Sequence, residues 1–317
     1  MGRYLARRLI QAVPVLFIVS LITFFVMHLM PGGPLAAYMN SPGLTAEGLA
    51  RLKHYFGLDR PLYVQYLSWL GELVKGNLGT SFVNGQPVLG RILERIPATL
   101  ALMLPSFLLS VILAVPIGVV GAVRKYSWID YLLTIFAYFG IAMPTFWFGI
   151  MLVIFFAVRL GWLPAQGWLT PGMGFSWTDL LRHLILPMTV LALYSVASWS
   201  RYLRSSLLET LGKDFVRTAR AKGLAEATVV LRHALRNALI PLVTVLAMDM
   251  PTLFSGALIT ETVFAWPGMG NLFYVSLTKR DYPVLMGILV FVSFLVVVFN
   301  LLADVLYGLL DPRIQYE

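Results

Sequence analysis

The sequence predicts an all-α integral membrane protein with six transmembrane helices, and three observations carry that prediction. Hydrophobic residues make up 59% of the 317-residue chain and charged residues 12%, against roughly 45–50% and 25% in soluble proteins. Several apolar segments approach the roughly 20 residues that cross a bilayer. Basic residues lie mostly in the connections between them, as in membrane proteins. We place the spans at 9–30, 98–123, 131–158, 184–200, 239–263 and 284–308.

The first span is expected to remain in the mature protein. Its basic start, with Arg3, Arg7 and Arg8, is like that of a signal peptide. The apolar stretch is about 20 residues long, which exceeds a signal-peptide core, and no small-residue cleavage site follows. The sequence PGGP at 31–34 ends this helix, because proline restricts the residue before it and cannot extend a helix.

The segment 31–94 is expected outside the cell and contains two short amphipathic helices. Their apolar residues recur at helical spacing, and a Gly- and Pro-containing turn at 57–61 separates them. The first set is Leu49, Leu52 and Phe56, and the second is Tyr63, Tyr66, Leu67 and Leu70. We expect both helices to lie against the outer surface or the lipid interface.

The distribution of lysine and arginine places both termini in the cytoplasm. An even number of spans puts the two ends on one side of the membrane. With the ends inside, the segment 201–237 is also inside, and it holds eight of the 24 basic residues. The long 31–97 segment carries six outside, but long translocated segments escape this rule. The net charge of +9 is therefore a topology signal for a multi-pass plasma- or inner-membrane protein, and no nucleic-acid partner is expected.

Acidic residues in the fifth span are candidates for a transport pathway. Asp249 lies within this span and Glu261 near its end, and an ionisable residue inside a membrane is a functional candidate. The alternative for Asp249 is a carboxyl group hydrogen-bonded to a neighbouring helix or a water cavity. Prolines interrupt the spans and permit gating through local kinks. They are Pro105, Pro116, Pro144, Pro187 and Pro251.

Catalytic chemistry is missing from the sequence. The chain has no cysteine, which excludes disulfides and thiolate metal sites. It contains no phosphate-binding P-loop, no H-E-x-x-H zinc motif and no G-x-S-x-G nucleophile turn. Its four histidines are scattered. We therefore expect a non-enzymatic protein that binds no cofactor or metal directly.

The polar segment 204–238 is predicted to form a helix, a glycine turn and a second helix. Asp214 is expected to cap the first helix by accepting amide protons, and Gly223 suits the left-handed position after its end. Small Ala219 lets this helix approach a partner. The second helix, at about 226–237, carries Glu226 near its positive end. This protruding knob would be a docking surface; the alternative is a solvated basic loop.

This segment, RTARAKGL…HALRNALIP, resembles the cytoplasmic signature loop of type I ABC importer permeases, specifically the dipeptide/oligopeptide/nickel branch. Ala219, Gly223 and Leu235 match the general pattern. The triplet 217–219 and the motif 233–236 match the branch. Similar motifs recur at 57–61, 76–79, 97–100, 144–147, 261–264, 266–268, 280–283 and 311–313. Gly33 and Asn77 depart from it, because the branch has Asp at both positions.

The resemblance implies a type I ABC importer transmembrane domain and its partners. The implied organisation is a first span at 1–30, an external segment at 31–94, a core at 95–308 and a cytoplasmic tail at 309–317. A homologous second permease would complete the pathway within the membrane lipid, cytoplasmic subunits would use ATP and Mg²⁺, and an extracytoplasmic binding protein would deliver the solute. Peptides, nickel chelates, glutathione and oligosaccharides are all carried by this branch.

The resemblance also implies which residues contact the ATPase. They belong to the loop 204–238, with Arg217, Thr218 and Ala219 expected on the contact face. The full set is Asp214, Arg217, Thr218, Ala219, Arg220, Lys222, Gly223, His233, Leu235 and Arg236. The alternative function is a secondary transporter or channel that uses Asp249 and an ion gradient, with no ATP and no partner subunits.

Overall fold

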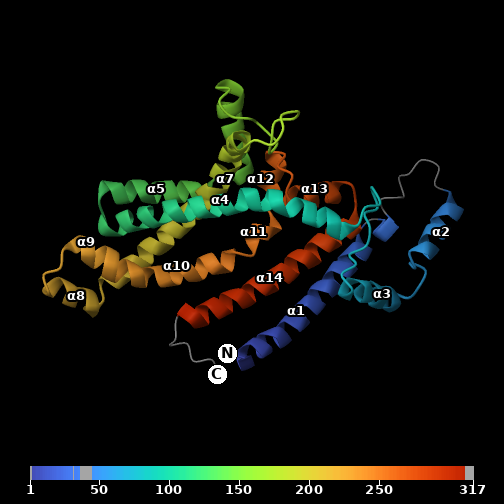
Figure 1. Cartoon of the computed structure of the whole chain (residues 1–317), viewed down its shortest axis with the longest axis horizontal. Helices are drawn as coiled ribbons and strands as arrows, with labels where there is room; N and C mark the ends of the chain where they lie inside the picture. Colours follow the sequence, from blue (N-terminus) through green and yellow to red (C-terminus); the bar gives the residue numbers. More distant parts are fainter. Residues whose placement is uncertain (1, 31, 36–44, 311–317) are drawn as a thin grey trace. The chain divides into compact units, whose positions relative to one another are not determined.

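The computed structural model of the chain is built almost entirely of helices (Figure 1). It describes residues 2–30, 32–35 and 45–310, and side chains for 7–8, 10–30, 32–35 and 45–302. Pro31 and the expected tail motif at 311–313 lie outside the described residues. Within the described ranges, the β pairing is an isolated bridge between Thr80 and Pro87. The chain divides into two compact units, and the first boundary along the chain, between Thr99 and Leu100, falls within one long helix, α4.

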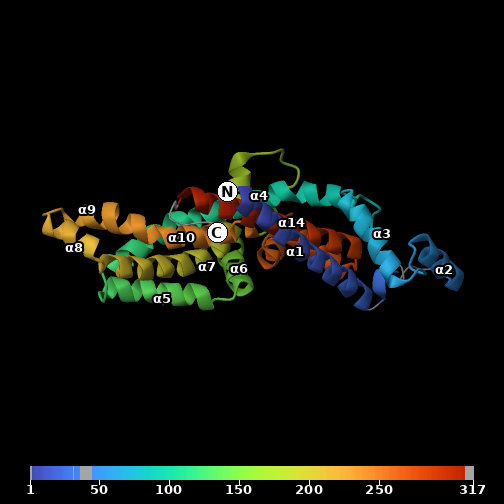
Figure 2. The same ribbon diagram turned by 90° about the horizontal axis from the view of Figure 1, so that it is seen from below.

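Unit 1 comprises Met1–Thr99, Phe254–Leu258 and Pro267–Glu317. Its two long helices, α1 (Gly2–Leu29) and α14 (Tyr282–Leu310), lie side by side (Figures 1 and 2). The start of α4 (Val88–Val123) packs against α14 and against α13 (Met269–Thr278). The buried side chains of this contact are Val88, Ile92, Met269, Leu272, Val284 and Ile288.

The two amphipathic helices predicted in the segment 31–94 are confirmed. A short 3-10 helix, η1 (Gly33–Leu35), precedes α2 (Ala46–Tyr55) and α3 (Leu62–Val74). The hydroxyl of Thr45 caps α2 by accepting a hydrogen bond of 3.1 Å from the Gly48 amide. Tyr66 of α3 is buried against α1, where its hydroxyl lies 2.8 Å from the Ser20 hydroxyl. The segment is therefore attached to the first span.

Asp281 holds the connection between α3 and α4 in place. Its carboxylate is 1% exposed and accepts hydrogen bonds from the Ser81 hydroxyl at 2.5 Å and the Phe82 amide at 2.9 Å. Arg91 neutralises it from 3.1 Å. Asp281, in the motif at 280–283, therefore ties the loop that follows the motif at 76–79 to the base of α14.

Unit 2 comprises Leu100–Leu253 and Ile259–Trp266. It contains the rest of α4 and the helices that follow α4 in the sequence. They are α5 (Trp128–Ala142), α6 (Thr145–Leu152), the π-helix η2 (Val153–Arg159), α7 (Trp177–Leu211), α8 (Asp214–Ala221), α9 (Glu226–Thr228), the π-helix η3 (Val229–Ala234) and α10 (Leu235–Asp249). Two short helices share residues with unit 1: α11 (Thr252–Ser255) ends in it, and α12 (Leu258–Val263) begins in it with Leu258.

Five helices of the described part are long and apolar enough to cross a membrane, or six if one bent pair is a single span. That pair corrects the third expected span, 131–158, because α5 and the following helix are bent by 103°. Met143 has an extended backbone at ψ 120°, since a residue before proline is pushed out of the helical region. The fifth expected span, 239–263, lies within the single candidate span Glu226–Val263, although its helix is interrupted after Asp249, where Pro251 and the positive φ of Gly256 follow.

Glycines set the close packing of α4 and α5 on α7. A Cβ atom added to Gly118 would lie 2.8 Å from the backbone oxygen of Ser200, and one added to Gly140 would lie 2.9 Å from the Cβ of Ala197. Small residues allow membrane helices to approach this closely, and the resulting van der Waals contact stabilises them. The three helices therefore form a tightly packed layer beside the polar segment that follows α7.

Candidate functional site

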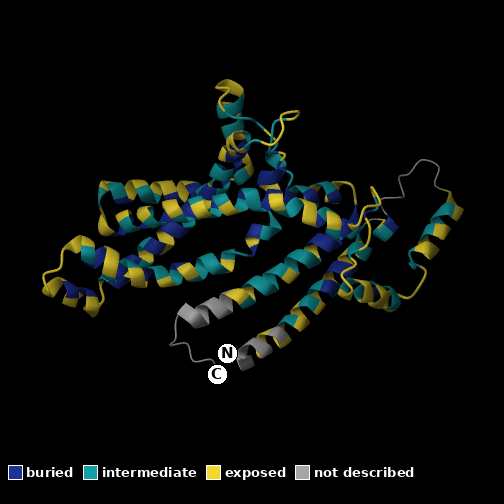
Figure 3. Ribbon diagram, viewed as in Figure 1, coloured by how far each residue is buried: buried dark blue, intermediate teal, exposed yellow. Residues whose placement is uncertain are grey.

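The polar segment after α7 is anchored in the core of unit 2. Val216 of α8 is fully buried and Ala219 is 6% exposed. Because residues three apart share one helix face, these two form the inner face of α8, and the remaining residues point outward (Figure 3). The cluster around them also contains Leu203 and Leu207 of α7, Val229 and Ala234 of η3, and Ala238 and Leu242 of α10.

Two expectations about α8 are wrong. Asp214 does not cap the helix: Lys213 is the extended residue before it, at φ −78° and ψ 152°, and Asp214 is the first helical residue. Its negative charge still lies in the first turn, where the helix dipole favours it. Ala219 does not lie on an outward contact face, because it packs against the chain's own helices. Its small size serves that internal packing.

The turn after α8 follows the sequence prediction. Gly223 has a φ of +78°, a backbone conformation that favours glycine, and its amide donates to the Arg220 carbonyl at 2.9 Å. Arg220 spans the turn by donating from Nε and Nη2 to the two carboxylate oxygens of Glu226, at 3.0 and 2.6 Å. The Glu226 carboxylate raises the pKa of Arg220. The turn is therefore braced by its own side chains.

The second helix of the segment was expected to end at about 237. It continues instead into the fifth span. Helical structure continues from α9 through the π-helix η3 into α10 without interruption. π-Helical turns, which are wider than α-helical ones, frequently occur at functional sites. His233 and Leu235 are half-buried and Arg236 is exposed. Movement of the segment would therefore pass directly into α10.

Sequence reasoning missed two exposed apolar residues beside the basic ones. Phe215 is 42% exposed and Leu224 is 40% exposed. The apolar residues Val216 and Ala219 are three positions apart and so share one helix face. This spacing was the sequence signal that could have placed Phe215 on the exposed face of α8. The exposed surface, called here the α8 surface, combines apolar and charged side chains. It consists of Asp214, Phe215, Arg217, Thr218, Arg220, Ala221, Lys222, Gly223 and Leu224.

A buried ion pair lies where this segment joins the helical layer. Arg204 of α7 donates from Nε and Nη2 to the two carboxylate oxygens of Asp130 in α5, both at 2.7 Å. The amide of Tyr126, in the turn between α4 and α5, donates to the same carboxylate at 2.9 Å. Asp130 is 3% exposed. One carboxylate therefore connects the α4–α5 turn, α5 and α7.

Asp249 lines a cavity of about 290 Å³ in unit 2, called here the Asp249 cavity. The indole Nε1 of Trp199 donates to Asp249 Oδ2 at 3.2 Å. Glu261 is fully buried in α12 and does not line the cavity, so the two pathway candidates are not brought together. The cavity is lined by Met103, Ser106, Phe107, Ser110, Thr145, Val190, Leu191, Tyr194, Ser195, Trp199, Asp249, Thr252 and Leu253.

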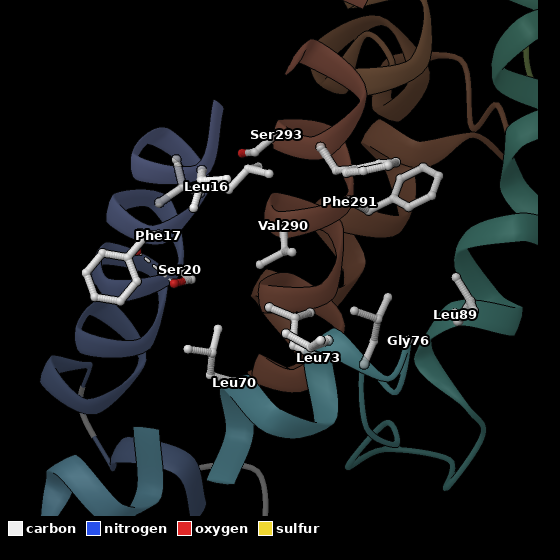
Figure 4. Close-up of a pocket in the computed structure, with 15 residues that line it drawn as sticks. Leu16, Phe17, Ser20, Leu70, Leu73, Gly76, Leu89, Val290, Phe291 and Ser293 are labelled. Atoms are coloured by element: carbon white, nitrogen blue, oxygen red, sulfur yellow. Dashed lines mark hydrogen bonds between the residues drawn. The ribbon is translucent and has the colours of Figure 1, made fainter. Parts of the chain in front are cut away.

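Unit 1 has an apolar groove of about 700 Å³ between α1, α3 and α14 (Figure 4). Leu16 and Phe17 come from α1, Leu70 and Leu73 from α3, and Phe291 from α14. None of its lining residues carries a charge. This groove suits hydrocarbon, whereas the Asp249 cavity offers hydrogen-bonding groups and a charge.

The α8 surface and the loop 160–176 lie at opposite ends of α7, as Figure 1 shows. This helix has 35 residues, which corresponds to about 50 Å at 1.5 Å per residue. The loop at the other end is fixed by Asp179, which accepts from the Thr170 amide at 2.6 Å and hydroxyl at 2.7 Å. A helix of this length is sufficient to place its two ends on opposite sides of a membrane.

Comparisons with known proteins match nearly the whole chain. The family model described as the inner membrane component of binding-protein-dependent transport systems matches residues 114–316, and the model of the N-terminal part of such components matches 1–103. The chain is 43% identical to the oligopeptide transport system permease protein AppB of Bacillus subtilis, covering 100% of both chains. It is 41% identical to the di/tripeptide transport system permease protein DppB of Pseudomonas aeruginosa, covering 99% of both.

Solved structures give the same fold. An inward-facing structure of the MetNI methionine ABC transporter has a chain that superposes with a TM-score of 0.57 at 17% identity, covering 70% of this chain and 97% of that one. A crystal structure of an amino acid ABC transporter with histidines gives a TM-score of 0.53 at 13% identity, covering 69% and 93%. At these identities the likeness concerns the fold.

Proposed function

Because this chain belongs to the family of inner membrane components of binding-protein-dependent transport systems, we propose that its α8 surface is where a separate ATPase drives transport. The chain is a multi-pass membrane permease subunit of an ABC importer, non-catalytic, with the type I importer fold. That membership replaces the alternative of a secondary transporter or channel working through Asp249.

The burial of Val216 and Ala219 carries the coupling proposal. A helix that served only to place positive charge on the cytoplasmic side would need no buried face. In this chain the buried residues of α8 pack in the same cluster as residues of α7 and α10. An ATPase that moves α8 would therefore move both helices as a rigid body. The contact is made by the α8 surface, above all by Arg217, Thr218 and Lys222 of the predicted set and by Phe215 beside them. Leu235 of the following helix packs against the cluster that contains Val216 and Ala219, and His233 and Arg236 lie beside it in the chain.

The proposed assembly contains four kinds of protein. A homologous second permease completes the pathway, a pair of cytoplasmic subunits hydrolyses ATP with Mg²⁺, and an extracytoplasmic binding protein delivers the solute to the segment 31–94. Both termini and the α8 surface lie in the cytoplasm. Support comes from the family itself, which consists of inner membrane components of binding-protein-dependent transport systems.

Peptides are the proposed solute. The relatives at 43% and 41% identity are named for oligopeptide and di/tripeptide transport, and they match along the full chain. Reconstitution with the three partner types and uptake of labelled di- and oligopeptides tests this proposal. Uptake of a nickel chelate or an oligosaccharide with no peptide uptake would assign a different solute.

Arg217→Glu tests the coupling surface. Arg217 is 74% exposed, and the Asp214 oxygen is 3.5 Å from it, so reversal of its charge should leave the fold intact and repel the ATPase contact. We expect several-fold less ATPase to co-purify with the permease. Arg51→Glu, on exposed α2, is the matched control and should have no effect. Unchanged ATPase recovery with Arg217→Glu would remove this residue from the interface.

The absence of native cysteine makes the topology directly testable. Lys222→Cys and Lys75→Cys introduce single thiols at exposed positions. In intact cells a membrane-impermeant maleimide should label Lys75→Cys alone, and after permeabilisation it should label both. Labelling of Lys222→Cys in intact cells would contradict the cytoplasmic placement of the α8 surface.

A further inference from the structure

The Asp249 cavity combines a carboxylate with several hydroxyl groups and aromatic rings. Asp249 contributes a carboxylate, and six lining residues contribute hydroxyl groups: Ser106, Ser110, Thr145, Tyr194, Ser195 and Thr252. No lysine, arginine or histidine is among the lining residues. The Trp199 indole that donates to Asp249 is a neutral group, so it supplies no positive counter-charge.

These groups match the requirements of a primary ammonium ion. An ammonium group has three hydrogen-bond donors and no acceptor, and both the carboxylate and the hydroxyl oxygens accept. The rings of Tyr194, Trp199 and Phe107 also line the cavity, and aromatic faces attract cations. Charge in a membrane segment is costly unless it is paired, so a bound cation would stabilise Asp249.

The size of the cavity limits the ligand to part of a peptide. Whole ligands of drug size bind in pockets of roughly 300–1,000 Å³, and this cavity has about 290 Å³. One amino acid residue with its charged end fits that volume. An anionic end would meet the Asp249 carboxylate and be repelled, which leaves the amino terminus as the matching part of the molecule.

We propose that the Asp249 cavity binds the positively charged amino terminus of the transported peptide, with Asp249 as the counter-ion and the surrounding hydroxyls as further acceptors. This inference rests on the proposed function, because it takes the solute to be a peptide. It gives the permease a share in solute recognition: peptides whose amino terminus is free are held in the pathway, and those without a charge there are not.

The test compares two ligands that differ only in the ammonium group. The full complex of both permeases and the ATPases is reconstituted in nanodiscs without binding protein. Equilibrium binding of Ala-Phe is measured beside propionyl-Phe, which lacks the amine. We expect the wild-type complex to bind Ala-Phe at least about tenfold more tightly, since the coupling measured between close charges in protein complexes is at least that large. Equal affinities would overturn the proposal.

Asp249→Asn should remove this discrimination, lowering the affinity for Ala-Phe to that for propionyl-Phe. Asparagine keeps the shape and the carbonyl acceptor for the Trp199 indole, so the variant isolates the charge. Glu47→Gln, an equivalent neutralisation on exposed α2, should retain the full tenfold ratio. Persistence of the ratio in Asp249→Asn, or its loss in Glu47→Gln, would overturn the assignment of the cation site to Asp249.

Uptake by the wild-type complex with its binding protein separates the two levels of inference. Import of Ala-Phe together with equal binding of the two ligands would overturn the cavity assignment and leave the proposed function standing. Failure to import any di- or oligopeptide would overturn the proposed function and the cavity assignment with it.

Discussion

The ion pair between Asp130 and Arg204 should be a major contribution to the stability of unit 2. Asp130 is 3% exposed and receives two hydrogen bonds from Arg204 at 2.7 Å. Removal of one partner of a buried pair costs about 3–5 kcal/mol, because the other charge is left buried without compensation. Solvent reaches Arg204, whose side chain is 30% exposed, so we expect about 2–3 kcal/mol for Arg204→Ala.

A double-mutant cycle checks this value. Asp130→Ala, Arg204→Ala and the double variant are unfolded by denaturant titration in mixed micelles, and the free energies of unfolding are compared. The double variant should cost little more than either single variant, which gives a coupling energy of about 1–3 kcal/mol. Arg201→Ala is the control: this neighbouring arginine lies over the Tyr138 ring at the surface, and its loss should cost less than about 1 kcal/mol. A coupling energy below about 0.5 kcal/mol would refute the reasoning.

Three further predictions concern other contacts. Gly118→Ala should lower the free energy of unfolding by about 1–3 kcal/mol, because the added methyl group overpacks against α7; the same titration measures it. Gly90→Ala, on the same helix with open space around it, should have no such effect. Equal effects of the two variants would contradict the packing argument. Asp281→Ala should release the loop before α4, seen as faster amide hydrogen exchange there and unaltered exchange in α7; a protected loop would show that other contacts hold it. Hydrogen bonding to His54 lowers the pKa of Asp59, so this pair stabilises the turn at ordinary pH and loses its effect as pH falls through the lowered pKa. In an NMR titration, His54→Ala should return the pKa of Asp59 towards its ordinary range. An unchanged pKa would exclude the histidine as the cause.

The sequence was a reliable guide where the structure depends on residues close together in the chain. The helices α2 and α3 were predicted from apolar spacing and a Gly–Pro turn, and Gly223 from the backbone conformation that a helix end requires. Each of these signals is local. They hold because few alternative conformations satisfy the same short run of residues.

Contacts between distant residues could not be predicted in this way. Asp130 and Arg204 are 74 positions apart, and nothing in either neighbourhood indicates the other. Asp281 and Ser81 are 200 apart. Proline was also ambiguous: Pro187 lies inside continuous α7, while Pro144 follows a 103° break. The outcome at each proline depends on how neighbouring helices pack, which a single sequence does not state.

The helices α7 and α10 are joined by hydrogen bonds near both ends of their contact. Ser206 donates to the Ala238 carbonyl at 3.0 Å beside the α8 surface, and Trp199 donates to Asp249 at 3.2 Å in the cavity. A change in the separation of the two helices therefore alters both places together. If the ATPase docks on the α8 surface and solute binds in the cavity, as proposed above, thermodynamic linkage makes the effect reciprocal: the factor by which the ATPase changes solute affinity is the factor by which solute changes ATPase affinity. A permease with no catalytic group of its own would in this way report the occupancy of its pathway to the enzyme that drives it.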